Sequence, residues 1–232
     1  MKTIKLAASL SKYPLFTIND LARLLRKDEK YVKVVAYRLM KDGIIKQVER
    51  GKYTVYDDVI EFASCIAVPS YISFWTALKF YGLTEQLPEQ VMIAIPKSKK
   101  NIIFNGTTIS FTKLKQFWGY SKIRYGAFDI MIAEKEKAII DCLLAKNTPF
   151  DEVAKAISSD ELDYNKLIDY TKKAGNISAA KRIGYLIENY GKDASKLLEM
   201  LDLNCIPLNW STRSAGKKNK RWKLTINWRP EL

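Results

Sequence analysis

The first 56 residues carry an ordered series of helix and strand signals. Apolar periodicity, capping residues and turn residues predict three helices and two strands, over residues 1–12, 18–25, 29–41, 44–48 and 52–56. Asp28 is placed to cap the third helix, and Gly43 is placed to end it. Three helices followed by a β-hairpin is the order of a winged helix-turn-helix, so residues 1–57 are predicted to form such a DNA-binding domain.

The third predicted helix has two chemically different faces. At about 100° per residue, four apolar side chains fall on one side and suit a core, namely Val32, Val35, Ala36 and Leu39. The opposite side carries lysines, a tyrosine and a valine, namely Lys30, Lys33, Val34, Tyr37 and Lys41. Such a face can lie in the major groove of DNA, where lysines contact phosphates or guanine edges and valine contacts a thymine methyl group.

The candidate DNA-binding residues extend over this helix and the hairpin that follows it. They are Lys27, Lys30, Tyr31, Lys33, Val34, Tyr37, Arg38, Lys41, Lys46, Arg50 and Lys52. Lysines opposite an apolar stripe are also typical of any solvated helix, and a winged helix can serve as a protein-interaction module. The element order and the basic residues of the hairpin favour DNA binding.

The excess of positive charge is concentrated at the two ends of the chain. The whole chain has 39 basic and 25 acidic residues, net +14; residues 1–58 have 13 and 7, net +6, and residues 213–232 have 7 and 1, net +6. The terminal block is predicted to form a second basic surface of Arg213, Lys217, Lys218, Lys220 and Arg221. Its expected ligand is DNA, RNA or an acidic protein, and the alternative is a solubilising loop beside a docked strand.

The middle of the chain, residues 58–147, is predicted to be an α+β unit with antiparallel strands. Helices are expected over residues 60–67 and from Pro69 to Tyr81, and a further helix is expected to begin near Glu134. The strands are expected near residues 91–95, 102–104, 107–111, 122–125 and 128–133. Asn105-Gly106, between two of them, is a strong hairpin signal.

Three carboxylates near the start of the next helix, Glu134, Glu136 and Asp141, come nearest to a metal or acid–base grouping. Their place at a helix start predicts capping, and the i,i+4 spacing of Lys137 and Asp141 predicts a surface ion pair. Residues 148–232 are predicted to form a helical bundle that ends in a short basic strand or loop. The fold class is therefore expected to be α+β.

Composition argues against catalysis. The chain has no histidine, which removes Ser-His-Asp and Cys-His nucleophiles and histidine-ligated metals. The three cysteines stand far apart, without a C-x-x-C pair, and the ten glycines form no phosphate-binding loop. We expect no enzyme activity, no catalytic residue, no metal and no cofactor. The absence of an export signal or a membrane-length apolar run predicts a cytoplasmic protein without a membrane partner.

Several segments, taken in order, resemble the AbiEi-type antitoxins of type IV toxin–antitoxin (abortive infection) systems. The segments that carry the resemblance are residues 41–45 and 49–53, then YISFWTAL with YGLTEQ at 71–86, IAEKEKA with Asp141, and RWKL with Asn227. The resemblance covers nearly the whole chain, and the segment at 71–86 is its most specific part.

The resemblance implies a two-part protein. A winged helix would bind double-stranded DNA at the promoter of its own operon, often at inverted repeats. The residues that correspond to the family's recognition helix are Lys30, Lys33, Tyr37 and Arg38, and those of the wing are Arg50 and Lys52. Residues 58–232, taken as one antitoxin domain, would counteract a nucleotidyltransferase-like toxin without necessarily forming a stable complex. The alternative function is an RNA-binding or protein-interaction module that works through the basic C-terminus.

Overall fold

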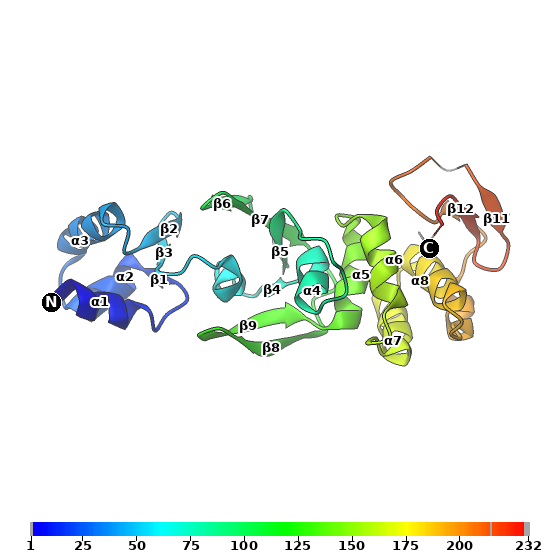
Figure 1. The fold of residues 1–232 in the computed structure, drawn as a ribbon, viewed down its shortest axis with the longest axis horizontal. Coiled ribbons are helices and arrows are strands. Elements are labelled where there is room, and N and C mark those ends of the chain that lie inside the picture. The colour runs from blue at the N-terminus through cyan, green and yellow to red at the C-terminus, as the bar shows by residue number, and fades with distance from the viewer. Residues whose placement is uncertain (1, 214, 230–232) are drawn as a thin grey trace. The chain divides into compact units, whose positions relative to one another are not determined.

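The structure, a computed structural model, describes residues 2–213 and 215–229 and has a mixed α+β fold with three sheets (Figure 1). The chain forms two compact units. Unit 1 comprises Met1–Ile72, Glu89–Lys113 and Ser121–Ile132, and unit 2 comprises Ser73–Pro88, Leu114–Tyr120 and Ala133–Leu232. The boundaries of the two units differ from the domain boundaries that the sequence predicts, after residues 57 and 147. The three domains stay a prediction. Residue 1, at the start of the first predicted helix, lies outside the described residues. So do residues 214 and 230–232 of the predicted basic terminal block.

The N-terminal part of unit 1 consists of helices and a small antiparallel sheet. Its elements are α1 (Lys2–Leu10), β1 (Phe16–Thr17), α2 (Ile18–Leu25), α3 (Glu29–Lys41), β2 (Lys46–Glu49) and β3 (Lys52–Thr54). The strands lie in the order β1-β3-β2, and both pairs are antiparallel. The sequence predicts these helices and the hairpin, but not the pairing of β1 with β3, because that contact joins residues far apart in the chain.

A single apolar cluster joins these elements. It is formed by Leu10, Phe16, Leu21, Val32, Ala36, Leu39, Ile45 and Tyr53, all of them buried. The predicted inner face of α3 is therefore confirmed for Val32, Ala36 and Leu39, while Val35 packs against the cluster partly buried. Each of the larger aliphatic side chains contributes about 1.5–3 kcal/mol to the free energy of folding when it is buried. Their burial fixes α3 against α1 and α2.

The rest of unit 1 contains a six-stranded sheet. Its strands are β4 (Tyr71–Ile72), β5 (Gln90–Ile95), β6 (Ile102–Phe104), β7 (Thr107–Lys113), β8 (Tyr120–Tyr125) and β9 (Phe128–Ala133), in the order β6-β7-β5-β4-β9-β8. The Asn105-Gly106 turn joins β6 and β7 as an antiparallel hairpin, with positive φ at both residues as such a turn requires.

The predicted antiparallel arrangement is wrong for two of the strand pairs. β5 pairs with β7 in parallel, and Ile72 of β4 pairs in parallel with Ile132 of β9. Strand β6 runs antiparallel to β7, and β7 lies between β6 and β5 in the sheet. Strand β5 is therefore paired with β7, not with β6, which follows it in the sequence. The continuous burial of Met92–Ile95 is typical of a strand covered on both faces.

Two of the helices predicted in the middle of the chain differ from the observed structure. Residues 60–67 form two short 3-10 turns, η1 (Val59–Glu61) and η2 (Ala63–Cys65), rather than one helix. The helix expected after Pro69 begins only at Phe74, because Tyr71 and Ile72 extend and join the sheet as β4. Sheet hydrogen bonding has overridden helical periodicity at this point.

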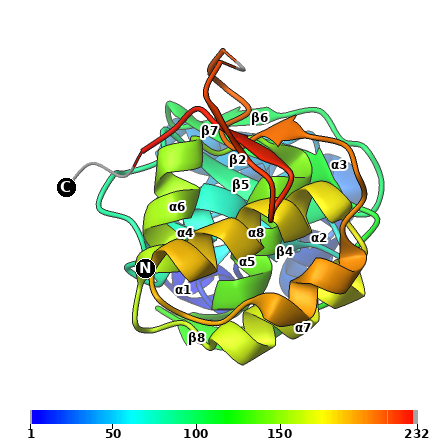
Figure 2. The same cartoon turned by 90° about the vertical axis from the view of Figure 1, so that its right-hand side faces the viewer.

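Unit 2 is mainly helical. Its helices are α4 (Phe74–Phe80), α5 (Lys135–Ala145), α6 (Phe150–Ser158), α7 (Tyr164–Ala174) and α8 (Ile177–Asn189). Helix α5 contacts α4, α6, α7 and α8 (Figure 2). After α8 the chain forms the 3-10 helix η3 (Ser195–Met200). The chain then enters a small sheet of order β10-β12-β11, made of β10 (Ile206–Pro207), β11 (Lys217–Asn219) and β12 (Leu224–Ile226).

Candidate nucleic-acid interface

Local hydrogen bonds fix where α2 and α3 begin. The Thr17 hydroxyl accepts a hydrogen bond from the backbone of Asp20 at 3.2 Å, and the Asp20 carboxylate accepts one from the backbone of Thr17 at 2.8 Å. This capping box starts α2. The Asp28 carboxylate accepts a hydrogen bond from the backbone of Tyr31 at 3.0 Å and starts α3, as predicted.

The face of α3 opposite its buried residues is exposed and unusually rich in large side chains. Tyr31, Val34 and Tyr37 are 51%, 50% and 64% exposed. Nine of the candidate DNA-binding residues are exposed: Lys27, Lys30, Tyr31, Lys33, Val34, Tyr37, Arg38, Lys41 and Arg50. Exposed aromatic and apolar side chains between lysines can contact bases as well as phosphates.

Most of the cations on this face have no internal partner. Lys33 forms an ion pair with Glu29 at 2.7 Å, one helical turn away. Within the described part of the chain, no ion pair involves Lys30, Arg38, Lys41 or Arg50. Such charges are solvated in the free protein and available to phosphates.

Two of the predicted wing residues are engaged inside the protein. Lys46 is half-buried and pairs with Asp57. Lys52 is half-buried, lies 3.0 Å from the Glu49 carboxylate, and donates a hydrogen bond to the carbonyl of Ile66. Charge alone selects these lysines in the sequence. Asp57 and Ile66 lie beyond the strands of the hairpin, and Glu49 lies opposite Lys52 within it. Arg50 is therefore the wing cation that remains exposed and unpaired in the described residues.

A hollow of about 540 Å³ lies between the start of α2, helix α3 and the β2–β3 hairpin. Polar side chains contribute to its lining, among them Thr17, Asn19, Lys33, Gln47 and Arg50. The sequence analysis did not select Thr17, Asn19 or Gln47, since short polar residues near a helix start and in a strand have no distinctive pattern. The hollow brings Arg50 of the hairpin and Lys33 of α3 to one concave surface, which Glu29, the ion-pair partner of Lys33, also lines.

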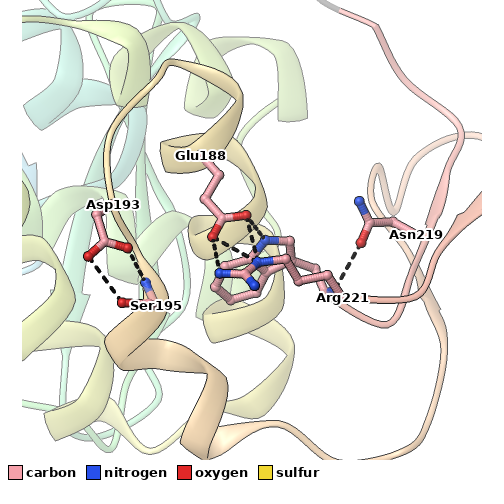
Figure 3. A network of polar contacts seen from close by, with 6 residues as sticks. Glu188, Asp193, Ser195, Asn219 and Arg221 are labelled. Atoms are coloured by element: carbon pink, nitrogen blue, oxygen red, sulfur yellow. Dashed lines mark hydrogen bonds and ion pairs between the residues drawn. The ribbon is translucent and has the colours of Figure 1, made fainter.

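The second predicted basic surface is only partly basic. Lys217, Lys218 and Lys220 are exposed around β11, and Arg213 is exposed before it. Arg221 instead binds Glu188 of α8 through two guanidinium nitrogens, at 3.0 Å from Nε and 2.8 Å from Nη2 (Figure 3). The Glu188 carboxylate offsets the charge of Arg221, although the Arg221 side chain is 52% exposed, and its membership of a second basic surface stays a prediction.

The same glutamate anchors the terminal hairpin in the core of unit 2. The Trp222 indole donates a hydrogen bond to Glu188 at 2.7 Å, and the Trp222 side chain is 1% exposed. Its ring lies against Gly184 of α8, where an added Cβ would stand only 2.0 Å from a ring carbon. A side chain larger than hydrogen at position 184 would therefore displace the tryptophan.

The three carboxylates near α5 are engaged in contacts with basic residues and hydroxyl groups. Lys166 lies 3.3 Å from Glu134 and 3.0 Å from Glu136, and Glu134 also accepts a hydrogen bond from Tyr170. Burial, together with this hydrogen bond, raises the pKa of Tyr170 to about 12. Among the described residues, no group of three or more metal-binding side chains of the Cys, Asp or Glu type comes together.

The predicted ion pair between Lys137 and Asp141 is present, but it does not lie on the surface. Both side chains are 0% exposed, and the Ser73 hydroxyl donates a hydrogen bond to Asp141 at 2.7 Å. The Lys137 ammonium lies 4.9 Å from the centre of the Trp118 ring. Burial lowers the pKa of Lys137 below its ordinary value, although Asp141 opposes this effect. Spacing along one helix predicts the pair but not its depth, which depends on the elements packed around α5.

Comparison with models of known protein families and with curated proteins gave no match. Among solved structures, the chain is similar to the crystal structure of the Rv2827c protein from Mycobacterium tuberculosis, with a TM-score of 0.68 and 14% sequence identity. The alignment covers 96% of this chain and 90% of that chain. This similarity shows a shared fold. Within the described residues, none of the helices has both the length and the apolar character needed to cross a membrane.

Proposed function

We propose that the protein is a DNA-binding transcriptional regulator whose N-terminal helices and hairpin act as a winged helix-turn-helix. The observation that carries the proposal is the exposed face of α3, where Lys30, Tyr37 and Lys41 surround Val34 and have no internal ion pair in the described residues. Arg50 shares a hollow with Lys33 of this helix. A helix in the major groove with a cation beside it on the wing is the arrangement that this geometry supports.

The chemistry of the face suits both affinity and sequence reading. Each lysine or arginine that neutralises a phosphate releases a condensed counterion, which makes binding tighter at low salt. Tyr37 and Val34 stand between the cations and can contact base edges or thymine methyl groups.

A gel-shift assay with promoter DNA tests this proposal. We expect the Lys30/Lys33/Arg50 triple alanine variant to stay folded and to lose at least tenfold in affinity, about 1.4 kcal/mol or more. The matched control removes three exposed lysines elsewhere, in a Lys113/Lys115/Lys196 triple alanine variant. Wild-type affinity in the Lys30/Lys33/Arg50 variant, or an equal loss of affinity in the control variant, would contradict the assignment of this face to DNA binding.

We further propose that the protein is the cytoplasmic antitoxin of a type IV pair, which represses its own operon and counteracts a nucleotidyltransferase-like toxin. The segments between residues 71 and 227 that carry the resemblance to AbiEi-type antitoxins support this role. Inspection of the neighbouring gene identifies the toxin to use. Co-expression of the full chain should restore growth of cells that express this toxin, and continued growth arrest would argue against the antitoxin role.

The exposed lysines of the terminal hairpin favour a second candidate function, an RNA-binding or protein-interaction module. Lys217, Lys218 and Lys220 are exposed and make no ion pair among the described residues. Their triple alanine variant is a better test than removal of residues 213–232, because the buried Trp222 would be lost with the segment. Loss of nucleic-acid binding in this variant, with an unaffected α3 variant, would favour the alternative.

A further inference from the structure

The wing is attached to the six-stranded sheet by a carboxylate that binds two lysines. Glu49, the last residue of β2, lies 3.0 Å from the ammonium of Lys52 and accepts a hydrogen bond from Lys99. Lys99 lies between β5 and β6, and its ammonium is 5.4 Å from the centre of the Phe111 ring on β7. The side chains of Glu49 and Lys99 are 22% and 27% exposed, so water screens this pair less than it screens a pair on the open surface.

The electrostatics of Glu49 agree with a tight contact. Burial alone would raise the pKa of Glu49, but the hydrogen bonds from Lys99 and Lys52 hold it below its ordinary value. The carboxylate is therefore charged at neutral pH and bound to both cations.

A second contact ties the other end of the same strand to the sheet. Lys46, the first residue of β2, pairs with Asp57, and Asp57 accepts a hydrogen bond from the Asn105 amide at 2.9 Å. Asn105 lies in the turn between β6 and β7, and β2 contacts β6. Both ends of β2 are thus connected to the segment that contains β6 and its turn.

These contacts fix the strand that leads directly into the wing cation. Arg50 follows Glu49 in the chain and shares the hollow with Lys33 of α3. We infer that Glu49 and Lys99 are positioning residues for DNA binding, because their ion pair fastens the wing to the sheet and keeps Arg50 beside α3. The inference rests on the proposed function, and it makes the sheet part of the DNA-binding module.

Charge and position predict opposite effects for one substitution. Glu49→Gln removes a negative charge near the proposed interface, so a purely electrostatic effect would tighten DNA binding. Loss of the attachment would loosen the wing and weaken binding. Lys99→Met removes a positive charge, and Lys100→Met is its matched control, since Lys100 is exposed in the same loop without a recorded ion pair in the described residues.

The test measures binding of the full-length variants to promoter DNA by fluorescence anisotropy. We expect Glu49→Gln and Lys99→Met each to weaken binding by about three- to tenfold, and the double variant to lose no more than either single one. Lys100→Met should lose less than Lys99→Met. Hydrogen exchange of the backbone amides of residues 46–54 should become faster in Glu49→Gln while α3 stays protected.

Wild-type or tighter binding by Glu49→Gln would overturn the inference, and so would equal losses in Lys99→Met and Lys100→Met. The Lys30/Lys33/Arg50 variant separates this failure from failure of the proposed function. If that variant loses binding and Glu49→Gln does not, only the positioning role is overturned. If that variant binds like the wild type, the DNA interface itself is overturned, and the positioning role with it.

Discussion

The buried pair of Lys137 and Asp141 gives a quantitative prediction about the stability of unit 2. Both side chains are 0% exposed, and Ser73 also donates a hydrogen bond to Asp141. Removal of one member leaves the other ionisable group buried without its partner, which costs about 3–5 kcal/mol. We therefore expect Asp141→Asn and Lys137→Met each to lower the free energy of unfolding by about this amount. Replacement of both by apolar residues, Lys137→Met with Asp141→Leu, should cost much less than the sum of the two single changes.

Urea denaturation followed by far-ultraviolet circular dichroism measures these losses. Lys172→Met is the matched control, because Lys172 pairs with Glu199 while the two side chains are 36% and 69% exposed. The control should lose about 0–1 kcal/mol, as surface ion pairs do. A loss of under about 1 kcal/mol in both single variants of the buried pair would show that the pair is solvated, and would refute the reasoning.

Further predictions concern the terminal hairpin and the start of α2. Trp222→Ala should destabilise the protein by about 3–5 kcal/mol in the same denaturation assay, because it empties a buried site. Arg221→Ala removes only a partly exposed ion pair and should destabilise the protein much less. Equal losses in the two variants would contradict this placement. Thr17→Ala should cost about 0.5–2 kcal/mol, and an unchanged unfolding midpoint would show that the capping box adds nothing. Hydrogen bonds from Thr17 lower the pKa of Asp20 below its ordinary value. The ionised carboxylate therefore stabilises the fold at neutral pH, and this contribution is lost as the pH falls below about 4. Thermal unfolding measured from pH 7 to pH 3 should show a smaller acid-induced loss of stability in Asp20→Asn than in the wild type.

Local signals in the sequence predict the N-terminal elements well. Asp28 and Gly43 bracket α3, and the apolar spacing of Val32, Ala36 and Leu39 identifies its inner face. The Asn105-Gly106 pair predicts the β6–β7 hairpin, because a two-residue turn with positive φ depends on the residues in the turn themselves.

Long-range contacts could not be predicted in this way. The parallel pairing of β5 with β7 depends on which strand is inserted in the sheet, and β4 is a strand only because β5 and β9 flank it. The same limit applies to charged residues. Basic residues predict a cationic surface, but whether each of them is free depends on the fold. Glu49 lies opposite Lys52 across the hairpin, and Glu188 of α8 pairs with Arg221.

The salt dependence of promoter binding tests the central claim most directly. The logarithm of the binding constant should fall linearly with the logarithm of the salt concentration, with a slope that grows by about 0.9 for each phosphate contact. If Lys30, Lys33 and Arg50 contact phosphates, the triple alanine variant should have a slope shallower than that of the wild type by about 2–3 units. A wild-type slope in this variant would show that the α3 face and the wing do not meet the DNA backbone, and would contradict the account.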